Sequence, residues 1–98
     1  MPAYLIVDIT IHNLQRFKDY VAAVPPFIKK HGGRYLVRGS ETETREGDWH
    51  PQRLVVIEFP SRASAQAFLE DPAYQPVAAI RHESATTNLV LADAAPLT

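Results

Sequence analysis

The chain has 98 residues, of which 46% are hydrophobic and 21% are charged, a composition typical of a folded globular domain and unlike that of a disordered segment. Ten basic residues, scattered along the chain, against eleven acidic ones give a formal net charge of −1, which argues against nucleic acid as a partner. The absence of cysteine excludes disulfides and thiolate chemistry. No charged leader precedes the first apolar stretch and no apolar stretch approaches about 18 residues, so we expect a cytoplasmic protein that does not enter a membrane.

The first third of the chain has the pattern of a strand followed by a helix. Residues 4–11 are rich in β-branched and aromatic side chains and are apolar at nearly every position, which predicts a strand. Asn13 can cap the next helix, whose apolar residues recur at steps of three and four. The proline pair at 25–26 predicts a kink or a fresh start in this helix, and the glycine pair at 32–33 predicts its end.

The middle of the chain predicts two strands joined by an arm. The second strand is expected at residues 34–38, and alternating glutamates and threonines at 41–44 suggest that it continues, exposed, beyond the sheet. The chain then turns at 46–48 and re-enters the sheet at Pro51, with a third strand at 53–59. We therefore expect a long hairpin arm between these two strands.

The last third repeats the helix and strand of the first. Ser61 can cap a helix, which the Asp-Pro pair at 71–72 breaks, and a second helical segment follows. The fourth strand is predicted at residues 86–91. Residues 94–98 are expected to be a frayed tail.

This order of elements predicts an α+β fold of the ferredoxin-like βαββαβ type. A four-stranded antiparallel sheet would carry both helices on one face, and residues 1–98 would form one domain. Because the strands are apolar on both parities, the helix-free side, here called the open face, would also be apolar. Burying such side chains is worth roughly 1.5–3 kcal/mol each, so we expect a homodimer that closes through this face. The apolar residues assigned to the open face are Ile6, Leu36, Leu54, Val56 and Val90.

Charged residues interrupt three of the strands. Under the same assignment Asp8, Arg38 and Glu58 point to the open face, together with Asn88. An unpaired buried charge is costly, so two interpretations follow. The one we favour is a salt-bridge network that sets the register of the dimer. The other is a polar pocket in which Arg38 orients an acidic or carbonyl-bearing ligand while Glu58 or Asp8 acts as a base.

Three aromatic or basic residues outside the strands are further candidates for ligand binding. The only tryptophan, Trp49, lies in the arm, where its indole is expected to anchor the arm on the partner subunit or to cover a pocket. Tyr74 and Arg81 are seven positions apart on the last helix and therefore share a face. With Tyr20 they would close a ligand cavity between helices and sheet. The expectation that we favour is that Arg81 binds a neighbouring carboxylate instead.

Several short motifs together carry a family resemblance. They are Ala-Ala-Val-Pro-Pro at 22–26, Gly-Gly-Arg-Tyr-Leu-Val-Arg-Gly at 32–39, Glu-Gly-Asp-Trp at 46–49, Arg-Leu-Val-Val-Ile-Glu-Phe-Pro-Ser at 53–61, Tyr74-Gln75 and Arg81. With these motifs the chain resembles, from Tyr4 to Asp93, the DUF1330 family of small ferredoxin-like proteins in the dimeric α/β-barrel superfamily. Ser40 replaces a usual second glycine, and Asn13-Leu14 replaces a usual Asp-Pro. The resemblance implies the fold and a dimer, and no agreed activity.

Two hypotheses about function follow from the sequence. In the first, the protein is a homodimeric binding or accessory module, with a small organic ligand as a further partner. In the second, it is a cofactor-independent enzyme of monooxygenase or isomerase type, acting on a small aromatic or carbonyl compound by general acid–base chemistry. Arg38 would orient that substrate, Glu58 or Asp8 would move a proton, and Trp49 would exclude water.

The absence of signatures favours the binding module. The four histidines are widely spaced, and the sequence contains no nucleophile motif, metal-ligand set or cofactor motif. We therefore expect no metal and no cofactor. A cavity of about 300 Å³ or more, lined by Arg38 and a carboxylate, would favour the enzyme, whereas a dry, filled interior would favour the module.

Overall fold

The structure is a computed structural model that describes residues 1–96, and its order of strands and helices confirms the predicted α+β fold. Each predicted helical region is divided in two, as the Pro-Pro pair at 25–26 and the Asp-Pro pair at 71–72 indicated. The elements are β1 (Ala3–Ile11), α1 (Leu14–Ala23), α2 (Pro25–Lys30), β2 (Arg34–Ser40), β3 (Arg53–Phe59), α3 (Arg62–Glu70), α4 (Gln75–Ser84) and β4 (Ala85–Asp93).

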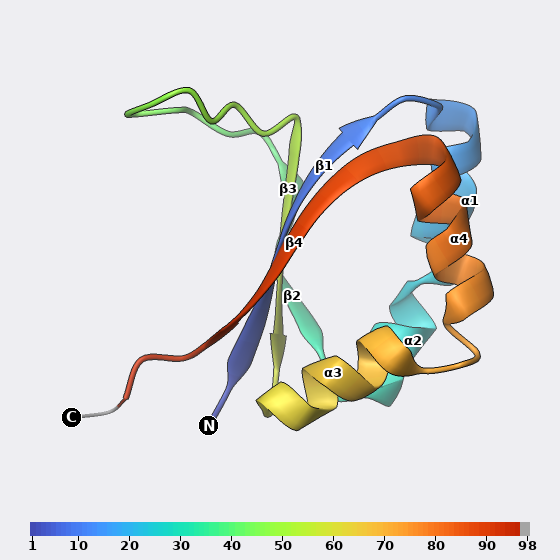
Figure 1. Ribbon diagram of the computed structural model, residues 1–98, viewed down its shortest axis with the longest axis vertical. Helices are drawn as coiled ribbons and strands as arrows, with labels where there is room; N and C mark the ends of the chain where they lie inside the picture. Colours follow the sequence, from blue (N-terminus) through green and yellow to red (C-terminus); the bar gives the residue numbers. More distant parts are fainter. Residues whose placement is uncertain (97–98) are drawn as a thin grey trace.

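The four strands form one antiparallel sheet in the order β2-β3-β1-β4. All the helices of residues 1–96 lie on one side of this sheet, and the other side carries no helix (Figure 1). No helix within residues 1–96 is long and apolar enough to cross a membrane.

Alternation along the strands places the core between the sheet and the helices. In β1 the buried residues Leu5, Val7 and Ile9 alternate with Ile6 and other half-buried residues. β3 alternates in the same way, so the predicted division of these two strands between the faces is confirmed. The core is completed from the helices by Phe17, Val24, Ile28, Ala65, Phe68, Tyr74 and Ala78.

The ends of the helices follow the predicted signals. The side chain of Asn13 accepts a hydrogen bond from the backbone N–H of Arg16 at 3.0 Å and caps α1. Ser61 caps α3 in the same way, through Ser64. After α2, Gly32 adopts a φ of +79°, which a residue with a Cβ atom rarely adopts, and the helix ends there.

The arm is present, but the expectation that strand structure continues into it is wrong. β2 ends at Ser40, and residues 41–52 project from the sheet without ladder pairing (the green loop in Figure 1). The Thr42 hydroxyl donates to the carbonyl of Pro51 at 3.1 Å, and the Thr44 hydroxyl donates to that of Trp49 at 2.6 Å. Side chains thus hold the two sides of the arm together where a strand would use its backbone.

An irregularity in β2 changes the face on which its later residues lie. Tyr35 pairs with Ile57, but the next pair joins Val37 to Val56, so β2 contains one extra residue there. Arg38 then pairs with Val55, whose side chain faces the helices. The prediction that Arg38 points to the open face is therefore wrong, because it assumed strict alternation through this bulge.

The predicted tail is only partly free. The backbone N–H of Ala94 still donates to the carbonyl of Pro2 at 2.9 Å, so order continues one residue past β4. Residues 95–96 have no regular structure, and residues 97–98 of the predicted tail lie outside the described residues.

Candidate ligand-binding site

A cavity of about 50 Å³ lies between the helix-covered face of the sheet and the helices. Most of its wall is apolar and comes from the core side chains of β1, β3, α1 and α2. Within residues 1–96, no aspartate or glutamate lines it. The polar groups of the wall are three guanidinium groups and three phenols, those of Arg38, Arg53, Arg81, Tyr20, Tyr35 and Tyr74.

Arg81 is the most buried of the three arginines. It lies on the last turns of α4, is 6% exposed, and has its Cζ atom 5.7 Å from the centre of the Tyr20 ring. Its Nε atom is buried without a hydrogen-bond partner, and Arg81 belongs to no ion pair formed within residues 1–96. The expectation that Arg81 binds a neighbouring carboxylate is therefore wrong. A buried guanidinium group without a counter-charge is costly, and this part of the wall lacks a negative charge that would balance Arg81.

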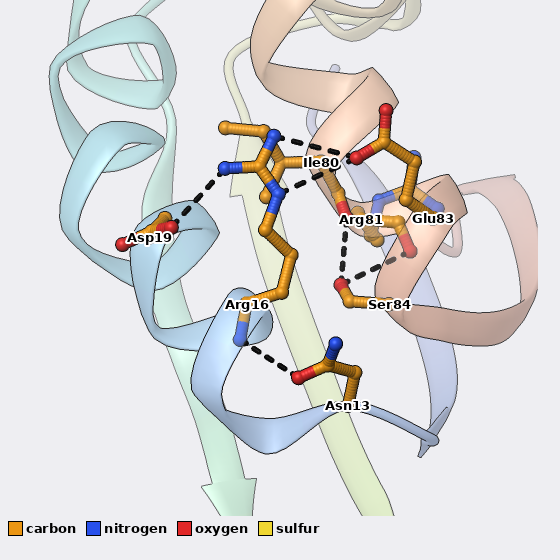
Figure 2. A network of polar contacts seen from close by, with 7 residues as sticks. All are labelled: Asn13, Arg16, Asp19, Ile80, Arg81, Glu83 and Ser84. Carbon is orange, nitrogen blue, oxygen red and sulfur yellow. Dashed lines mark hydrogen bonds and ion pairs between the residues drawn. The ribbon is translucent and has the colours of Figure 1, made fainter.

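A network of polar contacts fixes the turn of α4 that carries Arg81 (Figure 2). The guanidinium group of Arg16, on α1, contacts Glu83 on α4 at 3.3 Å and Asp19 on its own helix at 3.1 Å. The fully buried Ser84 hydroxyl donates to the carbonyl of Ile80 at 2.6 Å. The carbonyl of Ser84 also accepts the N–H groups of residues 12 and 13. The end of α4 is thus joined both to α1 and to the end of β1.

Arg38 and Arg53 enter the cavity from neighbouring strands. The Cζ atom of Arg38 lies 4.2 Å from the centre of the Tyr35 ring, and that of Arg53 lies 5.7 Å from the centre of the Phe17 ring. Both distances suit a cation–π contact. Arg53 also lines a cleft of about 370 Å³ on the outside of the molecule, so its side chain lies between this cleft and the cavity.

The predicted list of site residues omitted Arg53, although its position contained a usable signal. Arg53 has the same parity as Val55 and Ile57, and it pairs with Ile9 in the sheet. Counting back from the buried residues of β3 would therefore have placed it on the helix-covered face.

The tyrosines of the cavity contribute hydroxyl groups to its wall. The hydroxyls of Tyr20 and Tyr74 lie 2.9 Å apart, and Tyr74 is buried. Burial, followed by the proximity of Tyr74, raises the pKa of Tyr20 well above its usual range, and burial also raises the pKa of Tyr35. One of the paired hydroxyls donates to the other, so the pair keeps one O–H donor for a further acceptor.

The remaining predicted residues lie on the open face, as expected for Asp8, Glu58 and Asn88. The indole N–H of Trp49 donates to the Asp8 carboxylate at 2.7 Å, and both residues line a groove of about 340 Å³ with Asn88. Glu58 accepts a hydrogen bond from Arg34 at 2.8 Å, and this contact holds the pKa of Glu58 below its usual value.

The sheet therefore separates Arg38 from the two carboxylates that were expected to act with it. A site that combines Arg38 with Asp8 or Glu58 does not form within one subunit. The interior is neither the large cavity lined by a carboxylate nor the filled core that the sequence left as alternatives. Within the described part of the chain, no group of three His, Asp or Glu side chains could hold a metal ion.

The βαββαβ order, the antiparallel sheet and the one-sided helices define a ferredoxin-like α+β fold. The chain belongs to the family described as "Domain of unknown function (DUF1330)", which matches residues 2–95. No curated protein sequence matches it.

Solved structures of similar fold include a protein of unknown function and a cofactor-independent oxygenase. The RPA0582 protein of unknown function from Rhodopseudomonas palustris has a TM-score of 0.81 at 17% identity, covering 97% of this chain and 83% of that one. SnoaB, a cofactor-independent oxygenase from Streptomyces nogalater, has a TM-score of 0.66 at 18% identity, with coverages of 97% and 94%. Rv0793 from Mycobacterium tuberculosis has a TM-score of 0.55 at 19% identity, with coverages of 100% and 97%. At such low identity the similarity shows the fold alone.

Proposed function

We propose that this protein is a homodimeric binding module, and that each subunit holds a small organic molecule with an acidic or carbonyl group in the cavity between sheet and helices. The observation that carries the proposal is the convergence of three arginines, none paired with a carboxylate of residues 1–96, on an otherwise apolar cavity. Apolar walls with a few converging polar groups are typical of small-molecule sites.

The homodimer is supported by the composition of the open face. Val90 and Trp49 are 58% and 56% exposed there, beside the half-buried Ile6, Leu54 and Val56. Contiguous apolar surface of this kind marks an interaction site in soluble proteins. A second copy related by a two-fold axis would place the same surface against itself and cover both.

The enzyme hypothesis receives less support from the cavity. General acid–base catalysis needs a group that takes up a proton near neutral pH, within reach of the substrate. The cavity is lined by arginines and by tyrosines, and burial raises the pKa of Tyr20 and of Tyr35. The fold that the chain shares with SnoaB is the observation that keeps an enzyme as the second candidate.

A thermal-shift screen of small organic acids, carbonyl compounds and neutral analogues tests the proposed function. A compound at one hundred times its dissociation constant should stabilise the protein by about 2.7 kcal/mol. A control variant, Arg45→Met, removes a positive charge from the exposed arm, outside the cavity. It should respond as the wild type does. Silence of the wild type across a broad panel would contradict the proposal.

A further inference from the structure

We propose that the ligand of this cavity is a small organic monocarboxylate and that Arg81 is its anchor. This inference rests on the proposed function, since it assigns a chemical class to the molecule that the cavity holds. It assigns that class from the charges that the fold leaves unpaired.

The arginines of the cavity differ from most other basic residues of the chain. The ion pairs of residues 1–96 use Arg16, Lys30, Arg34, Arg45 and Arg62, all of them on the outside of the molecule, together with His31. Arg38, Arg53 and Arg81 take part in none of them. The cavity is thus a positively charged place in a chain whose formal net charge is −1.

Loss of a proton does not relieve this situation, because a guanidinium group stays protonated in proteins. With 6% of its surface exposed, Arg81 is also poorly solvated. A carboxylate is the group that matches the planar fork of an arginine, because it can accept two parallel N–H bonds. Binding one would supply the counter-charge and give a partner to the buried Nε–H group.

The size and lining of the cavity limit the rest of the molecule. One water-sized group requires about 10–15 Å³ of such space, so a cavity of about 50 Å³ holds on the order of four. The wall beyond the arginines consists of valine, leucine, isoleucine and aromatic side chains, which suit a short hydrocarbon body and not a second charge. The O–H donor that the Tyr20–Tyr74 pair retains suits a carboxylate oxygen as well.

Arg38 and Arg53 have a different place in this arrangement. Arg38 is an exposed residue and Arg53 lies between the outer cleft and the cavity. Both are therefore placed to attract an anion before it reaches Arg81, an effect that salt would screen. Entry from the outer cleft would bring the carboxylate past Arg53 first.

The test compares an acid with its neutral amide of the same shape. Butyrate and butyramide are titrated against the wild type and against Arg81→Met by calorimetry, with Arg45→Met as the matched control. The wild type and the control should bind butyrate at least about tenfold more tightly than butyramide. In Arg81→Met this preference should disappear. The unliganded Arg81→Met variant should also melt at a higher temperature than the wild type, because it no longer buries an unpaired charge.

Several outcomes would overturn the inference. Equal binding of the acid and the amide would contradict the carboxylate as the recognised group but would leave the proposed function standing. If neither compound binds, and no compound of the wider panel binds, the proposed function is contradicted too. Unchanged preference for butyrate in Arg81→Met, or in the equally uncharged Arg81→Gln if the methionine variant does not fold, would exclude Arg81 as the anchor. Phosphate or chloride binding as tightly as butyrate would exclude an organic acid as the specific ligand.

Discussion

Asp71, buried at the break between α3 and α4, joins parts of the chain that are far apart in sequence. One of its carboxylate oxygens accepts hydrogen bonds from Lys30 Nζ and His31 Nε2, each at 2.8 Å. The other accepts the backbone N–H of Ala73 at 2.9 Å. The contact with Lys30, followed by those with His31 and Ala73, holds the pKa of Asp71 well below its usual range. The carboxylate thereby joins the end of α2 to the segment between α3 and α4.

We predict that Asp71→Asn lowers the melting temperature by several degrees at pH 7 and by somewhat less at pH 3, which lies between the folded and the unfolded pKa of Asp71. The pKa of Asp71 is depressed in the folded state, and its unfolded value is about 3.9, so its contribution is complete above the unfolded pKa and is lost as the pH falls through the folded pKa. Thermal unfolding followed by circular dichroism at both pH values measures the difference. Asp19→Asn, in an exposed ion pair with Arg16, is the control and should change little at either pH. A deficit that is the same at both pH values would contradict this account.

Residue roles were predictable from the sequence where spacing alone decided them. The seven-residue separation of Tyr74 and Arg81 indicated a shared face, and both line the cavity. Arg38 was placed on the wrong face because its side depends on a bulge, which leaves no clear mark in the alternation of residues. Whether the predicted residues bind a ligand stays a prediction.

Of the sheet elements, β2 has the least regular geometry, and Gly39 is central to it. Gly39 adopts a φ of +71° at the second register shift, between Arg38 and Ser40. A Cβ atom at this position would lie 2.5 Å from the Cζ atom of Arg53. The glycine therefore serves both the turn of the backbone and the close approach of a cavity arginine.

We predict that Gly39→Ala costs about 1 kcal/mol of stability and also weakens ligand binding, because Arg53 must move. Gly47→Ala is a matched control: its φ is +81°, so the backbone cost is similar, but nothing lies within 4 Å of the added Cβ atom. Urea unfolding should show similar losses in both variants, and butyrate titration should show a loss of affinity only in Gly39→Ala. Equal affinities would mean that Arg53 does not act at the site.

The sequence predicted helices better than it predicted the arm. The caps at Asn13 and Ser61 and the proline breaks are local signals that act through the backbone next to them, and each appears where expected. The arm showed the alternation of a strand, but the hydroxyls of Thr42 and Thr44 bond to carbonyls on its other side. Alternation alone cannot separate a ladder from such side-chain pairing.

For the molecule as a whole, the open face is the feature on which the proposed homodimer rests. Figure 1 shows a sheet with all its helices on one side and with the arm projecting to the other. The overall architecture was predictable because the order of elements and the two-sided hydrophobicity of the strands leave few alternatives. The order of elements does not determine where a second subunit would bind, because that position depends on contacts between chains.

We predict that Val90→Lys converts the homodimer to a folded monomer. Val90 lies on the open face and is 58% exposed within the subunit, so a lysine there costs the subunit little but places a charge in the proposed interface. Leu14→Lys is the control, because Leu14 is also 58% exposed but lies on α1, on the other side of the sheet. Sedimentation at micromolar concentration should give one subunit for Val90→Lys and two for Leu14→Lys and the wild type. A wild type that sediments as a folded single subunit would contradict the dimer.

The alternation along β1 makes the sheet a partition with two independent sides. The side chains of Leu5, Val7 and Ile9 line the cavity, whereas those of Ile6 and Asp8 lie on the open face. If the cavity binds a ligand and the open face forms the dimer, as we propose, substitutions at odd-numbered positions of this strand would alter ligand binding and leave the contacts between copies unchanged. Substitutions at even-numbered positions would do the reverse, so the two properties could change independently in evolution.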